Sequence, residues 1–183
     1  TDAPKTDSAK TEQPVAKDEA PAAMPDSATM MKAWQDFATP GDMHKWMEKT
    51  NGTWEAEVSN WMSADAPPMK SKAVNVQSSA MGGRYVIGKF TGTMMGQPFE
   101  GMSTMGYDNG KKMFTSTWMD NMGTGIMYLK GKYDEKTKTL TSSGKMVDAM
   151  TGKEINVKET FMFVDDNTQI MEMFETRDGK ERK

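Results

Sequence analysis

A period of two in apolar positions runs through the chain from residue 53 to its end. Trp54, Ala56 and Val58 alternate with Glu55 and Glu57, which is the pattern of a half-buried strand. Similar segments recur about every 8 to 12 residues, a spacing typical of an antiparallel sandwich or barrel. They cover residues 72–80, 84–91, 99–107, 113–119, 124–133, 139–147, 154–164 and 169–175.

Short links rich in Gly, Asn and Asp separate these segments. Residues 94–98 form a bend, and Asn109-Gly110 has the residues that a two-residue hairpin turn needs at its positive φ angles. Because every link has hairpin length, we expect an up-and-down order that closes into a barrel of nine or ten strands over residues 51–183. Lys183 follows an Asp178-Gly179 turn, so we expect a further strand that this chain lacks.

Before residue 52 the apolar period is close to four, which predicts one or two short helices. Asp26 or Ser27 is a suitable cap for a first helix that ends near Ala38. Thr39 is a candidate cap for a second helix, with Pro40 at its first position. The expected apolar faces contain Met30, Met31, Trp34 and Phe37 in the first helix and Met43, Trp46 and Met47 in the second. We expect residues 26–50 to form a lid or plug.

Residues 1–25 contain four prolines and no aromatic residue, which predicts a disordered polar linker. The chain starts at Thr1 without an apolar leader, so we expect that a signal segment was removed and that the protein is exported. The expected location is the periplasm or the outer membrane. Lipid anchoring stays open, because a lipid-bearing cysteine is not among these residues.

Composition excludes several classes of protein. The net charge of −3 is spread without a basic block, which argues against nucleic-acid binding. No run of about 18 apolar residues predicts a transmembrane helix. Without cysteine there are no disulfides and no thiol chemistry. The 21 methionines either fill the core in place of leucine, or bind Cu(I) and absorb oxidation through their thioethers.

Several motifs together resemble the bacterial family called domain of unknown function fifteen seventy-nine, from about residue 42 to the end. They are His44–Trp54, Met81–Arg84, Met95–Gly101, Gly106–Asp108, Trp118–Asp120, Met122–Gly125, Gly131–Leu140 and Phe163–Asp166. The resemblance implies a calycin-like barrel, similar to lipocalins and fatty-acid-binding proteins, with no established activity, substrate or cofactor. It also implies one more C-terminal strand. This chain departs from the family pattern in its many methionines and its polar N-terminal segment.

Aromatic residues on the strands predict an apolar lining, which either holds a ligand or simply fills the barrel. The glycines among the strands are expected to thin this lining. Arg84 either reaches the barrel mouth to bind a carboxylate or closes a structural ion pair. The candidate ligand-binding residues are Trp54, Arg84, Phe99, Tyr107, Trp118, Tyr128 and Phe161.

The only histidine lies in the sequence Met43-His44-Lys45-Trp46-Met47. Met43, His44, Trp46 and Met47 resemble, in residue type, the Cu(I) site of small periplasmic copper chaperones. The alternative is an amphipathic helix that closes one end of the barrel, with an exposed or helix-capping histidine.

No arrangement for catalysis stands out, so we expect a protein that is not an enzyme. The favoured hypothesis is an exported barrel that binds a small hydrophobic or amphipathic molecule, with haem among the planar candidates. A second hypothesis is an accessory subunit of an envelope complex, docked through its N-terminal segment or an open barrel edge. A third is a Cu(I)-binding or oxidation-buffering protein.

Overall fold

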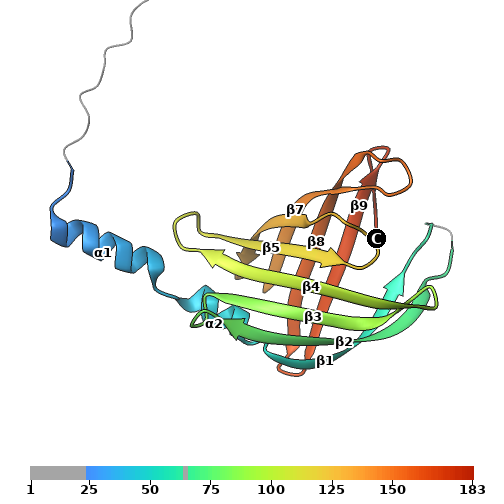
Figure 1. The fold of residues 1–183 in the computed structure, drawn as a ribbon, viewed down its shortest axis with the longest axis horizontal. Coiled ribbons are helices and arrows are strands. Elements are labelled where there is room, and N and C mark those ends of the chain that lie inside the picture. The colour runs from blue at the N-terminus through green and yellow to red at the C-terminus, as the bar shows by residue number, and fades with distance from the viewer. Residues whose placement is uncertain (1–23, 64–65) are drawn as a thin grey trace, which may run out of the picture.

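Ten antiparallel strands form one sheet in strict chain order in the computed structural model (Figure 1). The structure describes residues 24–63 and 66–183, so nearly all of the predicted linker 1–25 lies outside the described residues. The mainly β, up-and-down antiparallel fold predicted from the sequence is confirmed. The strands are β1 Gly52–Asn60, β2 Met69–Ala80, β3 Tyr85–Met94, β4 Gln97–Asp108, β5 Met113–Asp120, β6 Met127–Asp134, β7 Thr139–Val147, β8 Glu154–Asp165, β9 Thr168–Arg177 and β10 Lys180–Arg182.

The sheet curls into a half-barrel whose two edge strands are β1 and β10 (Figure 1). These edges are not hydrogen-bonded to each other, so the complete closure expected from the sequence is not reached within the described residues. One physical reason is length, since β10 has three residues and β1 has nine. The edges still approach near the chain end, where Lys183 Nζ lies 5.4 Å from the centroid of the Trp61 ring.

The hairpin turns differ in detail from the expectation. Two-residue turns with positive φ angles occur at Met95-Gly96, at 51° and 76°, and at Asp178-Gly179, at 50° and 72°, but not at Asn109-Gly110. Asp108 pairs with Met113, so four residues form the loop after β4. Asn109 Nδ2 instead donates hydrogen bonds to backbone carbonyls at the end of the first helix, including that of Thr39 at 2.8 Å. Within the loop, Asp108 Oδ1 accepts hydrogen bonds from the amides of Gly110 and Lys111 at 2.8 and 3.0 Å, so local bonds and the contact with the first helix together hold this turn.

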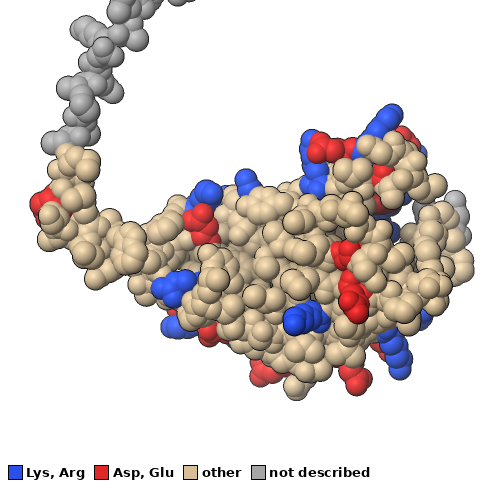
Figure 2. All heavy atoms as spheres, in the orientation of Figure 1, with Lys and Arg blue, Asp and Glu red and all other residues tan. Residues whose placement is uncertain are grey.

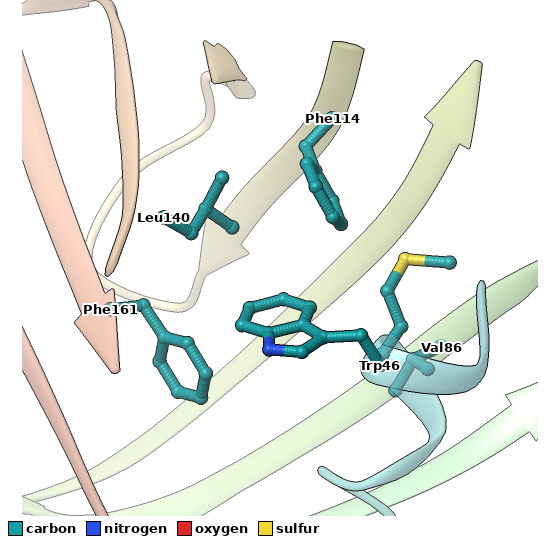
Figure 3. Packing of buried hydrophobic residues seen from close by; sticks show 6 residues of the cluster. Trp46, Val86, Phe114, Leu140 and Phe161 are labelled. Carbon is teal, nitrogen blue, oxygen red and sulfur yellow. The ribbon is translucent and has the colours of Figure 1, made fainter. Parts of the chain in front are cut away.

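The second helix, α2 Asp42–Glu48, fills one end of the curled sheet. Its Met47 is fully buried, and Trp46 is 9% exposed. Figure 3 shows the indole of Trp46 reaching from the helix toward Phe161, with Leu140 and Phe114 close by. Of the two helices expected to form a lid or plug, α2 therefore packs against the inner face of the sheet.

The first helix, α1 Ser27–Ala38, has no buried residue and projects away from the sheet (Figure 1). Asp26, one of the two caps expected from the sequence, is its cap and accepts hydrogen bonds from the amides of Ala28 and Thr29. Arg84 Nη2 donates to the carbonyl of Ala38 at 2.8 Å, which holds the far end of the helix. The expectation that both helices form a lid is therefore corrected, since α1 covers no part of the barrel interior.

The orientation of β2 places its two valines on the outer face. Val74 and Val76 are 37% and 46% exposed, whereas Ala73, which precedes Val74 and points to the opposite face, is buried. Ala73 pairs with Gly92, and a methyl group on Gly92 would lie 2.8 Å from the Ala73 methyl. This close approach needs small residues on the inner face, so the more apolar face of β2 remains outside.

Gly144 on β7 gives a prediction about the close packing of the wall. A methyl group there would overlap the carbonyl oxygen of Tyr128 and lie 2.8 Å from Leu129 Cδ2. We expect Gly144→Ala to lower the free energy of unfolding by about 1–3 kcal/mol, because backbone atoms must shift. Gly123→Ala is the control, since nothing lies within 4 Å of its added methyl group. Urea denaturation measures both, and equal stability of the two variants would contradict the packing described.

Candidate functional site

A half-open pocket of about 440 Å³ lies where α2 meets the β6–β7 hairpin and the end of β8. Its floor is apolar and consists of Met43, Trp46, Tyr133 and Phe163. We call it the mouth pocket. Its rim contains charges of both signs, from Asp42, Lys45, Lys49, Glu135 and Lys138. The volume falls within the range of about 300–1,000 Å³ that is usual for small-molecule sites.

The rim charges are only partly paired. Lys138 lies 2.9 Å from Glu135 and Lys45 lies 3.6 Å from Asp42. Within the described part of the chain, Lys49 has no carboxylate within ion-pair distance and is exposed. An acidic group of a ligand could therefore reach Lys49 without breaking an existing pair.

The candidate copper ligands serve a structural role around the same helix. His44 Nδ1 accepts a hydrogen bond from the Gly41 amide at 3.0 Å, so histidine caps the helix that was expected to start at Thr39 and Pro40. Burial lowers the pKa of His44, and its ring packs edge-on against Tyr107. Met47 is fully buried in the core. A copper ion would have to displace these contacts.

Trp46 is likewise occupied by packing. Its ring makes edge contacts with Phe114 and Phe161, with centroids 5.3 and 5.8 Å apart. No group of three His, Asp or Glu side chains that could hold a metal ion occurs among residues 24–63 and 66–183. The hydrogen bond of His44 to the Gly41 amide and the packing of Trp46 and Met47 favour the helix-capping interpretation of this segment.

A second aromatic cluster lies on the inner face of β3–β5, away from α2. Phe99 and Trp118 are stacked with centroids 6.3 Å apart, and Phe90 contacts both edge-on. Trp118 extends across Gly101, whose added methyl group would lie 2.5 Å from the indole. Here a glycine makes room for a neighbouring ring and does not leave an empty lining.

The other candidate ligand residues are divided among different environments. Tyr107 and Phe161 pack around α2. Trp54 Nε1 donates to the carbonyl of Thr50 at 2.7 Å. Arg84 is exposed and bound to backbone carbonyls, while Tyr128 is 46% exposed on the outer face. The structure thus brings some of the seven to the interior but gathers them at no single point, because strand alternation and α2 separate them.

Charged residues show no concentration of one sign on the face in Figure 2, where lysine, arginine, aspartate and glutamate are interspersed.

Arg177, the last residue of β9, donates to Asp148 in the β7–β8 turn at 2.9 Å and to Glu175 at 2.5 Å. Hydrogen bonds from Thr151 and then Arg177 hold the pKa of Asp148 below its usual value. Arg177 is paired with these two carboxylates, so its role is structural.

Glu159 is the functional candidate that the sequence reasoning missed. It lies on β8 between Val157 and Phe161, which are both buried on the inner face. Burial raises the pKa of Glu159 from 4.5 to about 7. The sequence contained a signal for this position. Glu159 lies two residues from each of these apolar neighbours, and side chains two residues apart on a strand point to the same face.

The model of a family described as "Protein of unknown function (DUF1579)" matches residues 39–183. The match includes α2 and all ten strands, and it begins one residue after the end of α1. No curated protein matches the chain. Neither helix in the described residues has the length and apolar character needed to cross a membrane.

Proposed function

The chain belongs to the DUF1579 family of unknown function, and from that premise we propose that it is a non-enzymatic protein that binds a small amphipathic molecule in the mouth pocket. The match to the family model confirms the resemblance seen in the sequence as family membership. The single observation that supports the binding proposal is the 440 Å³ pocket with an apolar floor.

The floor suits the apolar part of a ligand. Trp46, Tyr133 and Phe163 contribute aromatic surface, and Met43 adds a flexible thioether that adapts to different shapes. Two of the three rim lysines are paired with rim carboxylates, and Lys49, which has no ion-pair partner among the described residues, favours a ligand with an acidic group over one with a basic group. A fatty-acid-like carboxylate has both features.

The test is a fluorescence titration with a dansyl-labelled medium-chain fatty acid. We expect saturable binding by the unmodified protein and about a tenfold loss of affinity in Lys49→Glu, because the exchange replaces attraction by repulsion. Lys89→Glu on the outer face of β3 is the matched control and should bind normally. Absence of saturable binding, or equal affinity of Lys49→Glu and the control, would refute the proposal. A parallel titration with haem tests a planar ligand.

A second candidate function, an accessory subunit of a larger assembly, is favoured by α1. Its Met30, Trp34 and Phe37 are 41%, 66% and 60% exposed and occupy positions i, i+4 and i+7 of one helical face. This spacing is typical of a helix that inserts into an apolar groove of another protein. Self-association through α1 is the alternative. In that case the molar mass in solution would be that of a dimer, and Trp34→Asp would convert the dimer to a monomer.

A further inference from the structure

The links between strands fall at two ends of the sheet, because the ten strands are antiparallel and follow chain order. The links β2–β3, β4–β5, β6–β7 and β8–β9 lie at the end that α2 fills. The links β3–β4, β5–β6 and β7–β8 lie at the opposite end, together with β1–β2 and β9–β10 (Figure 1). We call the end formed by Met95-Gly96, residues 121–126 and residues 148–153 the loop end.

Exposed apolar side chains lie on all three links of the loop end. Met95 is 60% exposed in the β3–β4 link, and Met150 is 90% exposed in the β7–β8 link. In the β5–β6 link, Met122 and Ile126 are 53% and 65% exposed. At the α2 end, the described links consist of polar residues and glycine, apart from the exposed Met81. Exposed apolar side chains are therefore concentrated at one end of the sheet.

Hydrogen bonds hold the loops of this end in place. Asn121 Nδ2 donates to the carbonyl of Pro98 at 3.1 Å, and its Oδ1 accepts from the amide of Glu100 at 3.1 Å. These bonds join the β5–β6 link to the start of β4. In the β7–β8 link, Asp148 is paired with Arg177 at the end of β9. The apolar tips are therefore presented by a hydrogen-bonded frame, which lowers the ordering cost of binding.

Basic residues without an ion-pair partner border the loop end. Glu154 and Glu181, which lie beside them in the chain, already bind Lys145 and Lys158. In the described part of the links at this end, Asp178 is the exposed acidic residue that remains. The exposed basic residues that lie within ion-pair distance of no described carboxylate are Lys153, Lys180 and Arg182.

We propose that the loop end docks onto the surface of a lipid bilayer that contains anionic phospholipids. Met95, Met122, Ile126 and Met150 enter the boundary between the headgroups and the acyl chains, where their apolar surface leaves water. The three unpaired basic residues contact lipid phosphates and are attracted by the negative potential of the surface.

A bilayer fits the loop end better than an apolar groove of another protein does. Such grooves typically receive the continuous face of one helix or one strand. The apolar residues of the loop end instead lie on three separate links, and a lipid surface offers all of them an apolar layer at once. Three of the four are methionines, whose flexible thioethers adapt to a fluid surface.

Docking through the loop end leaves the mouth pocket accessible. The lining of that pocket comes from α2, the β6–β7 hairpin and the end of β8, at the other end of the sheet. The end of α1 is bound there as well, by Arg84 and Asn109. Membrane docking therefore goes beyond the proposed ligand binding and does not depend on it.

The first test uses vesicles of phosphatidylcholine with about a quarter of phosphatidylglycerol. Because the chain contains no cysteine, Met150→Cys provides a single site for an environment-sensitive NBD fluorophore. On vesicle binding we expect its emission to shift to the blue and to gain at least about twofold in intensity, because the label enters apolar surroundings. Met81→Cys, labelled in the same way at the α2 end, is the matched control and should change little.

Vesicle flotation of the unlabelled full chain measures the affinity. The double variant Ile126→Glu and Met150→Glu should bind at least about tenfold more weakly, since two carboxylates oppose both insertion and approach to a negative surface. Both positions are exposed, so the substitutions leave the fold intact. Met81→Glu should bind like the unmodified protein, and so should Trp34→Asp on the exposed face of α1.

Absence of binding to the anionic vesicles, equal binding to vesicles of phosphatidylcholine alone, or unchanged emission of the label at residue 150 would overturn the proposal. Loss of binding in Trp34→Asp, with normal binding of the double variant, would assign the contact to α1 instead. None of these results changes the fatty-acid titration of the mouth pocket.

Discussion

Glu159→Gln is expected to stabilise the protein by about 3 kcal/mol at pH values near 8. In the folded protein the pKa of Glu159 is raised from 4.5 to about 7, so the native state retains a proton that the unfolded chain releases. The stability of the unmodified protein must then fall as pH rises between these two values and stay level above them. At about 1.4 kcal/mol per pH unit, this interval corresponds to about 3 kcal/mol.

Urea denaturation across the pH range measures this effect. Below about pH 4.5 the variant and the unmodified protein should be equally stable, because the carboxyl is then protonated in both the folded and the unfolded states. The two curves should separate as the pH approaches 7. Glu100→Gln is the matched control, since Glu100 is exposed on β4. Curves that remain parallel at every pH would show that the Glu159 carboxyl is well solvated.

Trp46→Ala is expected to lower the free energy of unfolding by about 3–5 kcal/mol. The substitution removes the central ring of the core under α2, where Trp46 contacts Phe114, Tyr133, Phe161 and Phe163. The loss includes both the transfer of the ring from water and the cavity left among rigid aromatic neighbours. It should also detach α2, because Trp46 and Met47 are the deepest apolar contacts of that helix.

Trp34→Ala provides the matched control for this large effect. Trp34 is the same residue type but is 66% exposed on α1, so its removal should change stability by no more than about 0.5 kcal/mol. Chemical denaturation gives the stability of both variants, and amide hydrogen exchange reports whether α2 has become detached. Similar losses in the two variants would mean that α1 packs against the domain in solution.

Local sequence patterns predicted most of the fold. Alternation such as that around Trp54 predicts a strand without reference to the rest of the chain, and short polar links restrict neighbouring strands to hairpins. The up-and-down order over residues 51–183 follows from these two facts. The Asp26 cap and the end of α1 near Ala38 were also predictable, because capping depends on residues within one helical turn.

The candidate site was only partly accessible from sequence. Its aromatic residues could be recognised, but not which of them lie together. Phe161 packs under α2, whereas Phe99 and Trp118 lie on the inner face of β3–β5, and this separation depends on where α2 docks. Glu159 was missed because an acidic residue on a strand usually faces water. Its raised pKa arises from burial contributed by residues far along the chain.

The sequence by itself determined the strands, their hairpin order and the presence of two short helices, because these depend on interactions between near neighbours. Only the tertiary structure decided which faces are buried. Val74 and Val76 face outward because Ala73 must pack closely against Gly92, and Asn109 leaves its expected turn to bind the end of α1. The apolar face of α1 remains exposed for the same reason, since burial requires a complementary surface and not only an apolar pattern.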